Sequence, residues 1–94
     1  MSGSHLNTVQ KRLAYRVARR SMLEMDALLS PFFDPRIADF DDQMCARCER
    51  LLDLPDPDLY DWITGIKSVP EGVDRELIVQ IAAAQGGRVR TGVA

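Results

Sequence analysis

The stretch Arg19-Arg20-Ser21-Met22-Leu23-Glu24-Met25-Asp26 lies where a basic N-terminal segment gives way to an apolar one. Within it, Glu24 follows Ser21 at the spacing of a capping box, in which each side chain accepts the backbone N–H of the other residue at a helix start. The stretch therefore predicts that one helix ends before Ser21 and a second begins near Met22. The alternative is one continuous helix with Ser21 in its interior, and the residues alone leave both arrangements open.

The segment before this stretch predicts the first helix, over residues 8–20. Three apolar residues recur there at spacing four, which places them on one helical face. They are Val9, Leu13 and Val17. Asn7 or Thr8 is expected to cap this helix, because both residue types accept a backbone N–H at a helix start.

The segment after it predicts a second helix over residues 22–29. Its apolar face is made of Met22, Met25, Leu28, Leu29 and Phe32. Pro31 is expected to end this helix, because the residue before a proline is pushed out of the α region. Asp34-Pro35 is then expected to begin a turn.

Three further helices are expected, and an acidic residue is expected to cap each of the first two. They run from Asp39 or Asp41 to about Asp53, from Asp56-Pro57-Asp58 to Gly65, and from Asp74 to about Gln85. Their expected buried residues are Phe40, Met44, Cys48, Leu51, Leu52, Leu59, Trp62, Ile63, Ile66, Leu77, Ile78 and Ile81. A loop over residues 67–73 is expected to join the last two helices.

The fold class that follows is all-α. No stretch alternates apolar and polar residues as a half-buried strand does, and no Asn-Gly or Asp-Gly hairpin signal is present. Four to five short helices joined by short loops predict a compact bundle. The 94 residues make one domain. Residues 1–7 are expected to form a flexible leader and residues 88–94 a flexible tail.

Charge is distributed unevenly along the chain, although the formal net charge is only -2. Residues 1–24 carry five Lys and Arg residues against Glu24 alone, whereas residues 34–61 carry nine acids against three Arg residues. The basic segment allows a small nucleic-acid-binding protein as an alternative function, but the acidic middle of the chain opposes it. No apolar run reaches the ~20 residues of a membrane span. Two cysteines and no export signal predict a cytoplasmic protein.

Groups for catalysis are missing from the sequence. The single histidine is His5, in the expected leader, and no glycine-rich loop follows a strand to form a dinucleotide site. Cys45 and Cys48 form a Cys-x-x-Cys motif inside a predicted helix, and two sulfurs without further ligands do not make a zinc site. We interpret Cys48 as a core residue and Cys45 as a chance neighbour. A thiol redox protein is the weakest alternative.

Several segments together resemble the succinate dehydrogenase FAD assembly factors, whose signature is Arg-Gly-x-x-Glu. The matching segments are Lys11-Arg12-Leu13 with Tyr15-Arg16, Arg20-Ser21-Met22-Leu23-Glu24-Met25-Asp26, Pro31-Phe32-Phe33, Leu51-Leu52-Asp53 and Asp56-Pro57-Asp58-Leu59-Tyr60-Asp61-Trp62. They stand in the order and at the spacing of the family, across roughly residues 11–66. The chain departs from the signature at Ser21, where the family has Gly.

The resemblance implies a five-helix assembly factor and not an enzyme. Such a factor binds the apo flavoprotein subunit of succinate dehydrogenase, or of fumarate reductase, and promotes covalent attachment of FAD. It implies that FAD stays on the partner and that no cofactor is bound stably here. We expect a monomer that neither binds nucleic acid nor inserts into a membrane.

The resemblance also implies a partner-binding patch around the signature. Arg20 and Glu24 are carried over as contact residues, together with Ser21 between them. Arg and Glu four residues apart present a donor fork and an acceptor to one partner surface. Further candidates at the margin of the patch are Asp26, Arg16 and Tyr15.

Overall fold

The computed structural model describes residues 6–20 and 22–85, and in them the chain is all-α, as predicted. The elements are α1 (Thr8–Ala18), α2 (Leu23–Arg36), the 3₁₀ helix η2 (Ile37–Asp39), α3 (Asp42–Leu52), α4 (Asp56–Ile63) and α5 (Arg75–Ala83). Most of the predicted leader and the whole predicted tail lie outside the described residues. Within the described ranges no helix has both the length and the hydrophobicity to cross a membrane.

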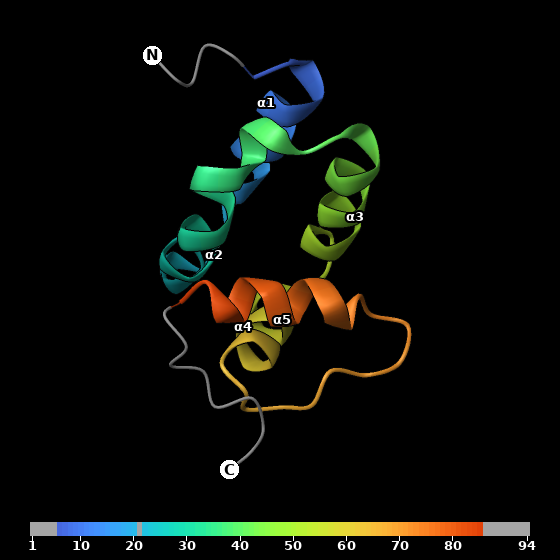
Figure 1. Cartoon of the computed structure of the whole chain (residues 1–94). Coiled ribbons are helices and arrows are strands. Elements are labelled where there is room, and N and C mark those ends of the chain that lie inside the picture. The colour runs from blue at the N-terminus through green and yellow to red at the C-terminus, as the bar shows by residue number, and fades with distance from the viewer. Residues whose placement is uncertain (1–5, 21, 86–94) are drawn as a thin grey trace.

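The helices form two groups (Figure 1). α1, α2 and α3 make the upper part of the molecule, while α4 and α5 lie together across the lower ends of α2 and α3. α1 packs on both α2 and α3, and α2 also packs on α4 and α5. This arrangement brings the connection between α1 and α2 close to the connection between α3 and α4.

α1 begins where the sequence predicts. Asn7 caps it and forms a capping box with Gln10: the Gln10 N–H donates to Asn7 Oδ1 (2.8 Å) and the Asn7 N–H donates to Gln10 Oε1 (2.9 Å). The Gln10 amide also donates to the carbonyl oxygens of Ala38 (3.1 Å) and Phe40 (2.9 Å). One buried polar side chain thus starts α1 and fastens it to the segment around η2.

α1 and α2 are separate helices, so the continuous-helix alternative is wrong. The chain leaves the helical conformation at Arg19 (ψ 68°), the C-cap of α1, and is extended at Met22 (ψ 129°), the N-cap of α2. The predicted capping box would place the N-cap at Ser21. The N-cap is instead Met22, whose own side chain makes no capping hydrogen bond. Ser21 itself lies outside the described residues.

The prediction that Pro31 ends the second helix is wrong, and so is the turn predicted at Asp34-Pro35, because α2 continues through both prolines to Arg36. The carbonyl of Pro31 loses its usual helical donor, since Pro35 has no N–H. Arg36 compensates, because its Nη1 donates to that carbonyl (3.1 Å) and to the carbonyl of Phe32 (3.0 Å).

Burial of two adjacent aromatic residues favours the longer α2. Phe32 and Phe33 are 2% and 1% exposed, and their rings meet edge to face with centroids 5.0 Å apart. Fully burying each such side chain contributes roughly 1.5–3 kcal/mol, so the two together offset much of the ~3 kcal/mol cost of each of the two prolines inside α2. Tertiary packing therefore overrides the local helix-breaking signal.

Of the two acidic caps predicted in the later helices, the one at Asp41 is confirmed and the one at Asp56 is wrong. Asp41 and Asp74 each accept the backbone N–H three residues further on, at 2.8 Å and 3.2 Å. Asp56 does not cap its helix, because the N-cap of α4 is Pro55 and Asp56 is the first helical residue. After α4, Gly65 has a φ of 82°, a left-handed conformation that glycine adopts without strain and that ends the helix as predicted.

A single apolar core joins the five helices. Its buried residues are Leu13, Val17, Met25, Leu29, Phe32, Phe33, Ile37, Cys45, Cys48, Leu51, Leu52, Leu59, Ile63, Leu77, Ile78, Ile81 and Ala82. Ile66, predicted to be buried, is 65% exposed because it follows the turn at Gly65 rather than continuing α4. Trp62 is half-buried against this core. Cys45 is buried as fully as Cys48, so it is not a chance neighbour of the core.

Candidate partner-binding site

The basic and acidic segments of the chain face each other across α1 and α3. Arg12 Nε lies 2.9 Å from Glu49 Oε2, and Arg16 pairs with both Glu49 (3.6 Å) and Asp53. Arg20, four residues further on, pairs with Asp56. We call these three arginines and three acids the ion-pair row. Because the row neutralises three cations of the basic segment, it weakens the nucleic-acid-binding alternative.

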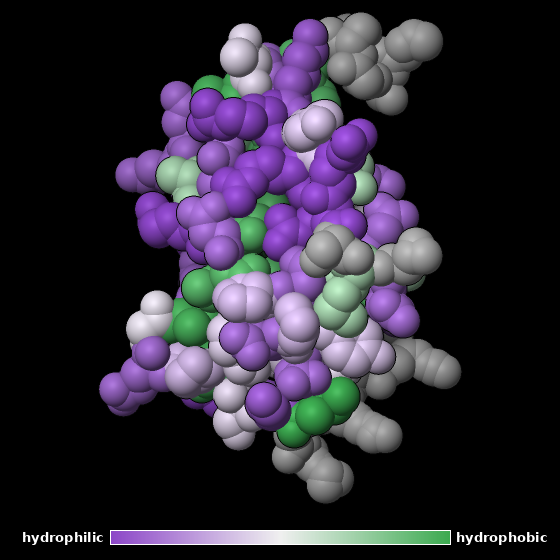
Figure 2. Space-filling model, turned by 180° about the vertical axis from the view of Figure 1, so that it is seen from behind, coloured by the Kyte–Doolittle hydropathy of each residue, from purple (hydrophilic) through white to green (hydrophobic). Residues whose placement is uncertain are grey.

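Hydrophilic side chains cover the half of the molecule that contains α1, α2 and α3, seen from behind in Figure 2. The half formed by α4 and α5 shows a more mixed surface. Sequence reasoning missed the ion-pair row, although a signal was present. The arginines recur every four residues at the start of the chain, and the acids recur at spacings of four and three from the last turn of α3 to the start of α4. Such a match predicts two helices with complementary faces.

Arg20 is the most deeply buried cation of the ion-pair row. Its side chain is 10% exposed and that of Asp56 is 3% exposed. Its Nε and Nη2 lie 3.0 Å and 2.6 Å from Asp56 Oδ1, and Nη2 also donates to the carbonyl of Leu52 at 2.9 Å. The guanidinium therefore fastens the α1–α2 connection to the α3–α4 connection. Direct contact of Arg20 with a partner stays a prediction.

Tyr15 and Arg19 form an exposed amphipathic pair beside Arg20. Tyr15 is 60% exposed, and the Arg19 guanidinium lies over its ring, 5.2 Å from the centroid. Stacking of this kind holds the aromatic ring and the cation together at the surface. A partner could meet both an apolar ring face and a positive charge here. Sequence reasoning placed Tyr15 in the patch but did not single out Arg19.

Glu24 and Asp26 are exposed on the first turn of α2. The Ser30 hydroxyl donates to Asp26 Oδ1 at 3.3 Å. Carboxylates at this end of a helix are favoured by the helix dipole. Of the six predicted site residues, Tyr15, Glu24 and Asp26 are thus exposed, Arg16 and Arg20 are engaged in ion pairs, and Ser21 lies outside the described residues.

An open hollow of about 380 Å³ lies beside this patch. Its wall on one side is the end of α1, with Arg16, Arg19 and Arg20, and on the other side the connection from Leu52 to Asp56. The hollow joins the exposed Tyr15–Arg19 pair to the ion-pair row. The geometry offers a partner a concave polar surface at the α1–α2 junction.

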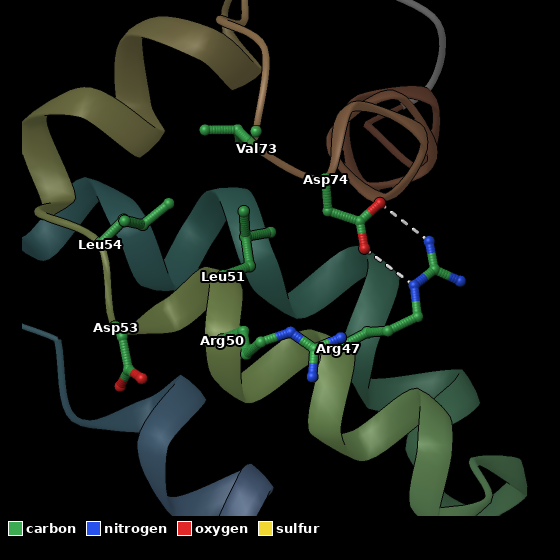
Figure 3. A pocket seen from close by; sticks show the side chains of 8 residues that line it. Arg47, Arg50, Leu51, Asp53, Leu54, Val73 and Asp74 are labelled. Carbon is green, nitrogen blue, oxygen red and sulfur yellow. Dashed lines mark hydrogen bonds and ion pairs between the residues drawn. The ribbon is translucent and has the colours of Figure 1, made fainter.

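A second groove, of about 460 Å³, lies between the end of α3 and the segment leading into α5 (Figure 3). Its apolar lining is Leu51, Leu54 and Val73. Arg47 spans one end, with Nε and Nη2 at 2.8 Å and 2.9 Å from the two oxygens of Asp74. Hydrogen bonding from Arg47 lowers the pKa of Asp74 from its usual 3.8, although burial opposes this. The pair fastens α5 to α3.

The two cysteines carry none of the features of a redox site. Cys45 and Cys48 are free thiols, 1% and 0% exposed. Burial raises the pKa of Cys48 to about 12 and raises the pKa of Cys45 as well. Reactive cysteines are exposed and have lowered pKa values, so these two are core residues. Among the described residues no group of three or more potential ligands could hold a metal ion.

The comparison with known families decides where the chain belongs. Residues 11–85 match the family model Sdh5, described as the flavinator of succinate dehydrogenase. The chain belongs to the Sdh5 family. The match covers most of α1 and all of α2 to α5, and it contains all six predicted site residues. The resemblance inferred from the signature and its neighbouring segments is therefore confirmed.

Curated members of the Sdh5 family are similar to this chain over 75 residues. This chain is 37% identical to the succinate dehydrogenase assembly factor 2-B, mitochondrial, of Drosophila mojavensis. The aligned region covers 78% of this chain and 48% of that protein. It is 33% identical to the succinate dehydrogenase assembly factor 2, mitochondrial, of Dictyostelium discoideum, and this alignment covers 80% of this chain and 53% of that protein. The chain thus spans about half the length of these relatives. No solved structure matches the chain.

The names of these relatives bear on two of the predictions. They describe assembly factors, which implies a non-catalytic role. They also describe mitochondrial proteins, so the expectation of a cytoplasmic protein stays a prediction.

Proposed function

We propose that this chain is an assembly factor that binds the apo flavoprotein subunit of succinate dehydrogenase and promotes covalent attachment of FAD. The observation that carries the proposal is the match of the Sdh5 family model to residues 11–85, nearly all of the helical domain. Fumarate reductase, which needs the same kind of subunit, is a second client. The factor acts in the cytoplasm, as a monomer that holds no FAD stably.

In this proposal the chemistry belongs to the flavin and its protein, and the assembly factor stabilises a conformation of the partner in which they react. That task needs a binding surface and not a catalytic set. The α1–α2 junction supplies an aromatic ring with a stacked guanidinium, two exposed carboxylates and a neighbouring hollow. Glu24 is the contact that an assay can probe most cleanly, because it is exposed on the first turn of α2.

The test is in-gel flavin fluorescence of the flavoprotein subunit from the same source, produced with and without this protein. Covalent flavin, and hence fluorescence, is expected to depend on the protein. Glu24→Ala is expected to reduce the affinity for the subunit at least ~tenfold, since losing a charge-assisted hydrogen bond costs roughly 1.5–3 kcal/mol. Glu71→Ala is the matched control, because Glu71 is also exposed but lies in the loop before α5.

Fluorescence that is the same with and without the protein would contradict the proposed function. A Glu24→Ala variant that is fully folded and as active as Glu71→Ala would remove Glu24 from the site but leave the function standing.

A further inference from the structure

The Asp56 carboxylate bridges the two residues on either side of position 21. Its Oδ1 accepts hydrogen bonds from Arg20 Nε (3.0 Å) and Nη2 (2.6 Å), and its Oδ2 accepts from the backbone N–H of Met22 (3.2 Å). Asp56 is only 5% exposed. A charged side chain is rarely buried so deeply unless it is paired, and here it is shared between two points of one connection.

The position of Asp56 in its own helix does not explain this arrangement. Asp56 is the first residue of α4, and Pro55 is the N-cap. The sequence pattern Asp-Pro-Asp suggests a cap, yet the carboxylate points to a chain segment about 35 residues earlier. Its contacts are therefore those of a bridge between elements.

The α1–α2 junction needs such a bridge. Arg19 and Met22 are both outside the helical conformation, and the Met22 side chain makes no capping hydrogen bond. The first N–H groups of a helix have no partner within it, so the N–H of Met22 depends on an outside acceptor. Asp56 supplies that acceptor and at the same time holds the guanidinium of Arg20.

We infer that Asp56 is a positioning residue, which holds the α1–α2 junction on the start of α4 so that Glu24 and its neighbours meet the partner in one orientation. The inference rests on the proposed function. It also assigns Arg20 a role other than partner contact, because the Arg20 side chain is 10% exposed and already binds the Asp56 carboxylate and the Leu52 carbonyl. Arg20 acts through Asp56, and the exposed groups around it make the contact.

The test compares Asp56→Asn with Asp74→Asn in the full chain. Asn keeps the size of Asp, but its amide nitrogen cannot accept a hydrogen bond, so one arm of the bridge is lost. Asp74 is the matched control, because it forms a two-oxygen pair with Arg47 and also lies at the start of a helix, away from the junction. Both variants are measured at a temperature at which circular dichroism shows them folded.

Two readouts are used. One is the affinity for the apo flavoprotein subunit, and the other is amide hydrogen exchange of residues 19–25. Asp56→Asn is expected to weaken binding at least ~tenfold and to speed exchange at this junction. Asp74→Asn is expected to stay within ~twofold in affinity, with faster exchange at α5 only. Combining Arg20→Lys with Asp56→Asn is expected to weaken binding by much less than the product of the single effects.

The two readouts separate failure of the inference from failure of the proposed function. If the unaltered protein does not bind the subunit, the proposed function fails, and exchange at the junction alone decides the role of Asp56. Unchanged exchange in folded Asp56→Asn overturns the inference, and so does an affinity equal to that of Asp74→Asn. If Asp56→Asn does not fold, Arg20→Lys replaces it, since Lys keeps the charge but loses the fork that holds Asp56.

Discussion

Stability should fall in steps as the arginines of the ion-pair row are removed from Arg12 to Arg20. The side chains of Arg12, Arg16 and Arg20 are 61%, 30% and 10% exposed, and all three bind acids between the last turn of α3 and the first residue of α4. The three truncations to Ala therefore vary burial while keeping the chemistry of the pair the same. Arg12→Ala is the internal control for Arg20→Ala.

The expected magnitudes differ severalfold. Breaking the exposed Arg12–Glu49 pair is expected to cost about 0.2–1 kcal/mol, because solvent screens it. Arg20→Ala removes three hydrogen bonds and leaves the buried Asp56 without its guanidinium, which is expected to cost about 3–5 kcal/mol. For a domain of this size 1 kcal/mol shifts Tm by roughly 4–8 °C. Arg20→Ala should therefore lower Tm by at least ~12 °C.

The assay is thermal and urea unfolding followed by circular dichroism, at low and at high salt. Salt should reduce the small effect of Arg12→Ala and leave the effect of Arg20→Ala nearly unchanged, because the buried pair is screened less. An Arg20→Ala variant that loses no more stability than Arg12→Ala would refute the reasoning. It would mean that the guanidinium of Arg20 is free in solution.

Three further outcomes are expected. Arg36→Ala should lower the free energy of unfolding in urea by about 1 kcal/mol. The loss should be smaller in a Pro35→Ala background, where the N–H of residue 35 can donate to the Pro31 carbonyl that Arg36 now binds. Equal losses in both backgrounds would contradict this. The pKa of Asp74 is lowered in the folded state, so the stability that its carboxylate contributes is present at neutral pH and is lost as the pH falls below about 4. Asp74→Asn should therefore make the free energy of unfolding depend less steeply on pH in the acid range. An unaltered pH dependence would argue against the Arg47 pair. Cys45 and Cys48 should react with a thiol reagent at pH 8 only as fast as the protein unfolds, whereas fast modification of the native protein would show that one thiol is accessible.

Local signals in the sequence predicted the helix starts well. Asn7 and Asp41 cap their helices as expected, because a cap depends only on a side chain and the backbone N–H groups two or three residues further on. Apolar spacing likewise predicted most of the core, including Leu13 and Leu77.

Local signals failed where side-chain packing or an ion pair competes with them. Pro31 does not end α2, because aromatic burial and the Arg36 side chain compensate for the lost backbone hydrogen bonds. Asp56 does not cap α4, because Arg20 and Met22 bind its carboxylate. In both cases the local preference of the residue is real, but its free energy is smaller than that of packing or ion pairing in the folded chain.

The sequence by itself determined the all-α class, a total of four to five helices and the family, since these follow from periodicity, caps and ordered motifs. It also predicted the region around Arg20 as the candidate site. Only the tertiary structure decided which of those site residues face solvent. Arg20 and Glu24 are four positions apart in the sequence, yet one is held by Asp56 and the other is exposed. The reason is that burial and ion pairing depend on residues more than thirty positions away, and these come together only when α1, α3 and α4 pack.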